Sequence, residues 1–109
     1  MQPPTLFVNK SAISGERHAE MTWGAAQAGV AAGVADSLAD DVILPDRVGT
    51  LVLITAVWVD PNAADAKAVF ENNRGATRLA LMAGVRGGPR LVEVLEARND
   101  PWNPFYRPR

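Results

Sequence analysis

Residues 5–33 have the sequence TLFVNKSAISGERHAEMTWGAAQAGVAAG, and this stretch sets the architecture of the chain. Its first six residues favour a short β-strand that ends near Asn9. Ser11 to Gly15 has turn composition, and Ser14 or Gly15 is suited to start a helix with Glu16 in its first turn. We therefore expect a strand, a turn and then a long helix.

The expected helix runs from about Glu16 to Asp41. Trp23, Val30, Val34 and Leu38 recur at helical spacing and predict its buried face. Gly24, Gly29 and Gly33 each weaken a helix by up to about 1 kcal/mol relative to alanine. Because small residues let a second backbone come close, we expect this helix to pack tightly on a sheet or on a symmetry-related copy.

The remainder of the chain continues the alternation of strand and helix. Leu51 to Val59 is nearly continuous apolar sequence, typical of a central strand that is buried on both faces. Asp60 and Pro61 suit the cap and first position of a second helix, expected from about Asn62 to Gly84. Leu91 to Ala97 predicts a last strand, and residues 99–109 an irregular tail. The chain is thus expected to be one α/β (α+β) domain over residues 1–109, in the order β-α-β-α-β.

Composition excludes several classes of function. The 109 residues carry a net charge of −1 and no cysteine, which favours neither nucleic-acid nor membrane binding and removes disulfides and thiolate metal sites. No signal peptide or membrane-spanning run is evident, so a cytoplasmic location is expected. Arginines concentrate from Arg74 onward; they are either a solvated face or contacts for an anionic group on a ligand or neighbouring subunit.

Lys10 and Gln27 are the candidate ligand-binding residues. Lys10 follows a strand and precedes a turn, where α/β folds tend to bind ligands. Gln27 is a lone amide among apolar neighbours and needs hydrogen-bond partners. The alternative is a surface lysine and a core glutamine satisfied by backbone. His18, the only histidine, is expected to be a surface residue of the first helical turn, neither catalytic nor a metal ligand.

Several segments resemble the formaldehyde-activating enzyme family. The match begins with TLFVNK at residues 5–10 and GAAQAGVA at residues 24–31, which are similar to TLMFNK and GPAQHGVA of the family at the same separation. It continues through Ile43–Pro45, the apolar run at Leu51–Val59, Ala63–Lys67 and Ala76–Ala80. The resemblance covers residues 5–98 without an evident gap.

This resemblance implies both a fold and an activity. It implies a fold like the second domain of ribosomal protein S5, shortened at the N-terminus, and homo-oligomers, pentamers in the family, that bind a pterin between subunits. It implies a lyase that condenses formaldehyde with tetrahydromethanopterin, a co-substrate rather than a tightly bound cofactor, to give the methylene derivative and water. Lys10 and Gln27 match pterin-contacting residues of the family, and Ala12 matches a contacting threonine whose hydroxyl it lacks.

The catalytic acid is not assigned. The family's proposed acid is a histidine in an N-terminal portion that this sequence does not match, and His18 aligns with a glutamine instead. Three hypotheses therefore follow: an active lyase, a non-catalytic protein that binds the pterin or formaldehyde, and a protein that joins oligomers of a longer relative. Because a sheet of three strands would leave apolar surface exposed, we expect an oligomer in each case.

Overall fold

The computed structural model of the chain describes residues 3–87. Strand β1 (Thr5–Asn9) leads into a continuous helical rod made of α1 (Gly15–Glu20), a π-helical turn η1 (Met21–Ala26) and α2 (Gln27–Ala39). A 3₁₀ segment, η2 (Pro45–Thr50), precedes strand β2 (Leu53–Val57) and helix α3 (Ala66–Val85). The expected α+β class is confirmed. The predicted strand Leu91–Ala97 and the tail lie outside the described residues.

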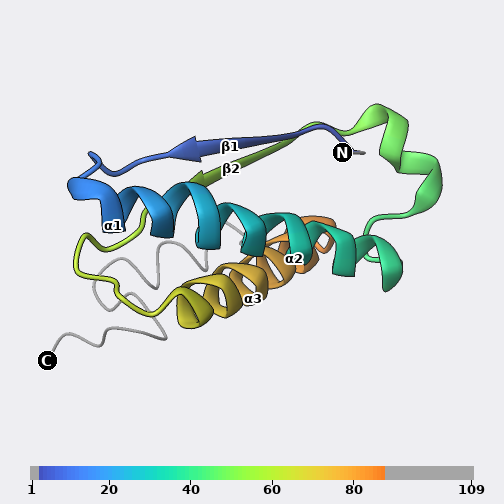
Figure 1. The fold of residues 1–109 in the computed structure, drawn as a ribbon. Coiled ribbons are helices and arrows are strands. Elements are labelled where there is room, and N and C mark those ends of the chain that lie inside the picture. The colour runs from blue at the N-terminus through green and yellow to red at the C-terminus, as the bar shows by residue number, and fades with distance from the viewer. Residues whose placement is uncertain (1–2, 88–109) are drawn as a thin grey trace, which may run out of the picture.

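The two strands form a parallel sheet that the helices cover on one face (Figure 1). The register pairs Thr5 with Leu53 and Asn9 with Val57. Parallel strands require a crossover connection, and the helical rod supplies it. Phe7 and Val57 point toward the helices and pack against a small core of Met21, Ala26, Val59 and Val69.

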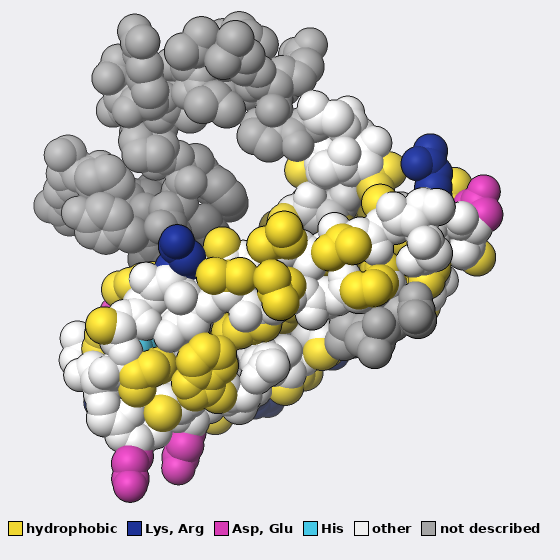
Figure 2. All heavy atoms as spheres, turned by 90° about the horizontal axis from the view of Figure 1, so that it is seen from above, with side chains coloured by type: hydrophobic (Ala, Val, Ile, Leu, Met, Phe, Trp, Pro, Cys, Tyr) yellow, Lys and Arg dark blue, Asp and Glu magenta, His cyan; other side chains and the backbone are white. Residues whose placement is uncertain are grey.

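The expectation that Leu51–Val59 is buried on both faces is wrong for the described part of the chain. The strand itself is shorter, and its burial alternates. Ile54 is 70% exposed and Trp58 60% exposed, whereas their neighbours Leu53 and Val57 are partly covered. Viewed from above the sheet, hydrophobic side chains gather over the strands (Figure 2). An unbroken apolar run predicts that both faces of the strand are covered. It does not show that the covering residues belong to the same chain.

The helical rod confirms the long helix predicted from Glu16 to Asp41, with one unforeseen feature. Buried residues recur every fourth position, at His18, Thr22, Ala26, Val30 and Val34. In a regular α-helix that spacing would rotate the stripe by about 160° from first to last, since each residue turns roughly 100°. The π turn η1 absorbs one extra residue and keeps the stripe on one side. Trp23, expected on the buried face, is 48% exposed.

Helix α2 crosses α3 at very close range because its contact positions are glycines. A Cβ placed on Gly33 would lie 2.8 Å from the Arg74 carbonyl oxygen and 2.7 Å from Thr77 Cβ, and one placed on Gly29 would overlap the Phe70 carbonyl oxygen. The tight packing that the glycines predicted is therefore confirmed. The partner is α3 of the same chain, rather than the sheet or a second copy.

Ion pairs border the same helix contact. The Arg74 guanidinium donates to both Asp36 carboxylate oxygens, with Nε–Oδ2 at 2.6 Å and Nη2–Oδ1 at 2.9 Å. Arg78 Nη2 lies 3.4 Å from Asp40 Oδ2. These contacts decide neither of the two alternatives for the arginines from Arg74 onward: Arg74 and Arg78 pair with acidic residues of α2 within the chain and remain partly exposed.

Helix α3 begins at Ala66, later than predicted. Asp65 caps it, its Oδ1 accepting from the Ala68 N–H at 3.2 Å. Asp60, predicted to be the cap, instead accepts from the Asn62 N–H at 2.8 Å and closes a turn. Asp–Pro suits both structures, so local sequence did not separate them.

Replacing Gly33 by alanine should lower the free energy of unfolding by about 1–3 kcal/mol, because the added methyl group overpacks the α2–α3 contact. Gly24→Ala is the matched control, since a Cβ there meets nothing within 4 Å. That variant should be neutral or stabilised by up to about 1 kcal/mol. Urea unfolding of the three proteins measures the difference; equal stability of both variants would contradict the close contact.

Asp36 should contribute to the loss of stability in acid. Its hydrogen bond to Arg74 lowers the Asp36 pKa below the ordinary value of 3.8, against a smaller opposing effect of burial. The folded state therefore binds fewer protons, so the stabilisation is present above the unfolded-state pKa and is lost as pH falls through the lowered folded value. Asp36→Asn should flatten the pH dependence of unfolding below about pH 4. Exposed Asp46→Asn should leave the slope as in the parent protein, and equal slopes in all three would refute the assignment.

Candidate functional site

Lys10 lies where the prediction placed it, immediately after β1 at the end of the sheet. Its backbone N–H donates to the Val57 carbonyl oxygen at 2.8 Å, which extends the β1–β2 ladder by one bond. The side chain is exposed. The backbone of Lys10 is thus anchored while its ammonium group can reach a ligand.

Two hydrogen bonds of the Asn9 side chain hold the turn around Lys10. The Asn9 amide donates to the Ser11 carbonyl oxygen at 2.7 Å, and its Oδ1 accepts from the Ser11 N–H at 3.0 Å. These two bonds fold the chain tightly around Lys10. Ala12 follows in an exposed position and offers only a methyl group.

His18 is fully buried, so its expected surface position is wrong. Its Nε2 lies 2.7 Å from the Val59 carbonyl oxygen, and its Nδ1 lies 2.9 Å from the Ser14 backbone nitrogen. The ring joins the start of the helical rod to the chain that leaves β2. The sequence signal for its burial was its spacing: His18 is the first of the buried residues that recur at every fourth position, and Thr22 and Ala26 follow it.

The hydrogen bonds of His18 also fix its tautomer. The Ser14 N–H can only donate, so Nδ1 accepts and the proton resides on Nε2, which donates to Val59. Ser11 Oγ lies 3.2 Å from this same Nε2. A serine nucleophile needs a ring nitrogen that accepts its proton. The buried Ser11–His18 pair is therefore a structural contact, not a nucleophile and base.

Gln27 opens α2 and is exposed, which contradicts the alternative of a core glutamine. Among residues 3–87 its amide has no hydrogen-bond partner. One turn earlier, half-exposed Trp23 packs its ring against Phe7 with centroids 5.8 Å apart and planes inclined by 59°. Gln27 thus presents free hydrogen-bonding groups beside an aromatic surface.

Lys10 and Gln27 come from different elements. Lys10 follows β1 and Gln27 opens α2, and both are exposed. A ligand that contacts both residues would bridge the end of the strand and the helical rod.

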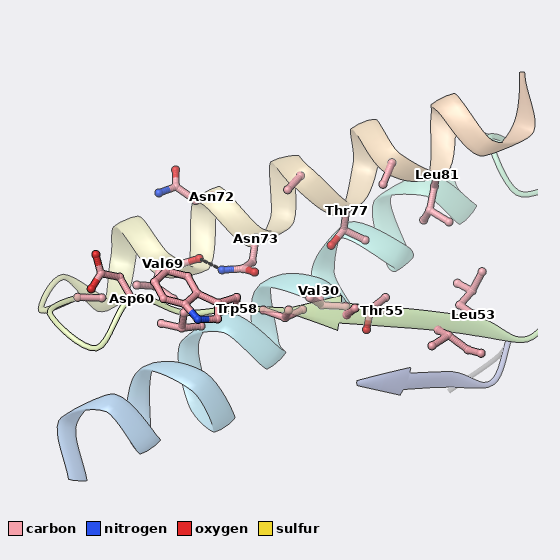
Figure 3. A pocket seen from close by; sticks show the side chains of 17 residues that line it. Val30, Leu53, Thr55, Trp58, Asp60, Val69, Asn72, Asn73, Thr77 and Leu81 are labelled. Atoms are coloured by element: carbon pink, nitrogen blue, oxygen red, sulfur yellow. Dashed lines mark hydrogen bonds between the residues drawn. The ribbon is translucent and has the colours of Figure 1, made fainter. Parts of the chain in front are cut away.

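A separate groove of about 900 Å³ lies between β2 and α3 (Figure 3). Its walls are mainly apolar and carry the amides of Asn72 and Asn73; Asn73 donates to the Val69 carbonyl oxygen at 2.8 Å. Trp58 and Asp60 lie at one end. Lys10, Ala12 and Gln27 do not line this groove, so it is distinct from the predicted contact residues.

The described residues hold neither a cluster of possible metal ligands nor a helix able to cross a membrane. Across residues 3–87, no three histidine or acidic side chains are placed to share a metal ion. Within the same range, no helix combines the length and apolar character needed to cross a membrane.

Comparison with known proteins identifies relatives that match most of the chain. A 5,6,7,8-tetrahydromethanopterin hydro-lyase of Methanosarcina barkeri is 36% identical over 104 residues, which cover 95% of this chain and 58% of that protein. A bifunctional enzyme Fae/Hps of the same organism is 37% identical over 98 residues, 90% of this chain and 25% of the relative. The bifunctional enzyme of Archaeoglobus fulgidus is 32% identical over 104 residues. The chain thus spans little more than half of the hydro-lyase and about a quarter of the bifunctional enzymes.

A family model also matches the chain, including the strand, turn and helix that hold Lys10 and Gln27. The model described as formaldehyde-activating enzyme (Fae) matches residues 1–106. This match confirms the resemblance carried by residues 5–10 and 24–31. The chain belongs to the formaldehyde-activating enzyme family.

Proposed function

We propose that this chain acts in the condensation of formaldehyde with tetrahydromethanopterin, forming the methylene derivative and water. The observation that carries the proposal is the family match over residues 1–106. Within it, Lys10 stands exposed on an anchored turn, and the resemblance of residues 5–10 pairs it with a pterin-contacting lysine of the family. The similar hydro-lyase bears tetrahydromethanopterin in its name. Because the chain covers only part of that relative, the activity is a proposal for this chain.

The chemistry demands positioning more than strong activation. The pterin amine attacks formaldehyde to give a carbinolamine, whose hydroxyl group is then protonated and leaves as water. Holding the two reactants together supplies part of the acceleration. Lys10 and Gln27 would orient the pterin through charge-assisted and amide hydrogen bonds.

None of the described residues is assigned as the acid that protonates the carbinolamine hydroxyl group. His18 cannot serve without breaking its bonds to Ser14 and Val59. Absence of a positioned acid costs about 10²–10⁴-fold in rate. The alternative function is a homologue that binds the pterin or formaldehyde without efficient turnover, and the feature consistent with it is Ala12, which lacks the hydroxyl group of the family's threonine.

A homo-oligomer fits the surface of the chain. Leu6 and Ile54, which are partners in the sheet, and Val52 and Trp58, which lie on either side of β2, are all more than half exposed. Such a patch is unusual on a monomer and is commonly covered by another subunit. We propose that this single domain has the ribosomal protein S5 domain 2-like fold, forms pentamers as the family does, places the pterin between subunits, and works in the cytoplasm.

Purified protein mixed with formaldehyde and tetrahydromethanopterin should form the methylene derivative faster than the uncatalysed mixture. Lys10→Ala and Gln27→Ala should each weaken pterin binding, measured by calorimetry, by about 10-fold or more, since each removes a ligand hydrogen bond. Lys67→Ala removes an exposed lysine from the start of α3 and should bind normally.

The outcomes separate the hypotheses. If the parent protein binds the pterin but forms the methylene derivative no faster than the uncatalysed mixture, the lyase hypothesis is rejected and the binding-protein hypothesis is favoured. Unchanged affinity in both Lys10→Ala and Gln27→Ala would reject the site. Ala12→Thr restores the family hydroxyl and should tighten binding by about 2- to 10-fold.

Ile54→Lys should shift the protein toward smaller species in sedimentation, because it places a charge in the apolar sheet face. Leu79→Lys is the matched control: Leu79 is 65% exposed on α3, away from the sheet. A folded monomer for the parent protein at micromolar concentration would contradict the proposed oligomer.

A further inference from the structure

We propose that His18 is the positioning residue for Lys10. The inference rests on the proposed contact between Lys10 and the pterin, but its structural premise can be measured without a ligand. The hydrogen-bond partners of His18 are Ser11, Ser14 and Val59, not Lys10. His18 acts by fixing the turn from which the Lys10 side chain projects.

The turn has anchors on both of its sides. On the strand side, the Lys10 N–H is bonded to Val57 of β2. On the helix side, His18 Nδ1 accepts from the Ser14 N–H, and Nε2 contacts Ser11 Oγ at 3.2 Å. Residues 11–14 are therefore tied at both ends to one imidazole ring.

The same ring connects the turn to the sheet. Its Nε2–H donates at 2.7 Å to the carbonyl oxygen of Val59, two residues beyond β2, and Ser11 Oγ lies 3.4 Å from that oxygen. Strand β2 also anchors Lys10 itself through Val57. His18 thus connects the turn to the end of the sheet in one rigid frame. The His18 side chain itself is fully buried.

A fixed turn matters for Lys10 because the lysine side chain is flexible. A lysine ammonium sits on a flexible four-carbon stem and carries no geometric preference of its own. Its placement then depends on where the backbone starts the side chain. A shift of about 1 Å in a positioning group can cost on the order of 100-fold in a reaction that depends on orientation.

Two substitutions distinguish positioning from general stabilisation. His18→Leu keeps the volume but removes every hydrogen bond, whereas the amide of His18→Gln can still donate to Val59. Ser37→Ala is the destabilised control, because it deletes a buried bond from Ser37 Oγ to the Gly33 carbonyl oxygen at 2.9 Å, on α2 and away from the turn. Pterin dissociation constants and unfolding free energies are measured for all three.

We expect His18→Leu to weaken pterin binding about 10-fold, His18→Gln to recover most of this loss, and Ser37→Ala to lose stability with affinity unchanged. The decisive comparison is the double variant. If His18 acts through Lys10, His18→Leu combined with Lys10→Ala binds no more weakly than Lys10→Ala alone. Additive losses would overturn the inference.

Amide hydrogen exchange tests the premise even if no pterin binds. His18→Leu should accelerate exchange at Ser11 and Ser14 by about 10-fold or more relative to Ser37→Ala, with little change in α3. Equal exchange in the two variants would overturn the positioning role, whereas failure of the parent protein to bind the pterin would overturn only the proposed function. If His18→Leu does not fold, Ser11→Ala replaces it in both measurements with the same expected direction.

Discussion

The described part of the molecule depends on how closely α2 can approach α3. Gly29 and Gly33 remove the side chains that would separate the two backbones, and the carbonyl oxygens of Phe70 and Arg74 occupy the space. Dispersion contacts at this distance offset the helix propensity that the glycines lose. The ion pair between Asp36 and Arg74 borders the contact and fixes its register. With α3 held there, β2 and α3 diverge and leave the apolar groove between them.

The other end of the rod is attached by different chemistry. There His18, rather than a glycine, makes the contact, and its hydrogen bonds reach the chain beyond β2. One helix is therefore joined to α3 by close packing and to the sheet by a buried imidazole. The turn that carries Lys10 lies at this second attachment, so a solvent-exposed lysine is supported by one of the most buried groups in the molecule.

Much of this arrangement could be predicted from sequence where local signals agree with the fold. The strand at residues 5–9, the long helix, its glycine contact and the position of Lys10 follow from propensity and spacing. The predictions that were wrong share a cause: each depends on which residues from elsewhere in the chain pack against a given side chain. Asp60 had the composition of a helix cap, but the helix starts where Asp65 caps it. Ile54 and Trp58 are as apolar as core residues, yet the described chain leaves them exposed, and His18 is buried because Ser14 and Val59 satisfy both of its nitrogens.

The π turn between Met21 and Ala26 has a consequence for how this chain tolerates changes in length. The two attachments of the rod face the same way because η1 absorbs one residue more than an α-helical turn would. Deleting one residue there would remove the π turn and leave the two halves in the same phase, whereas deleting one residue from the regular helix on either side would rotate them by about 100° relative to each other. In the second case either the histidine or the glycines would turn away from their partners. The rod can therefore lose one residue within η1, but the lengths of α1 and α2 are constrained.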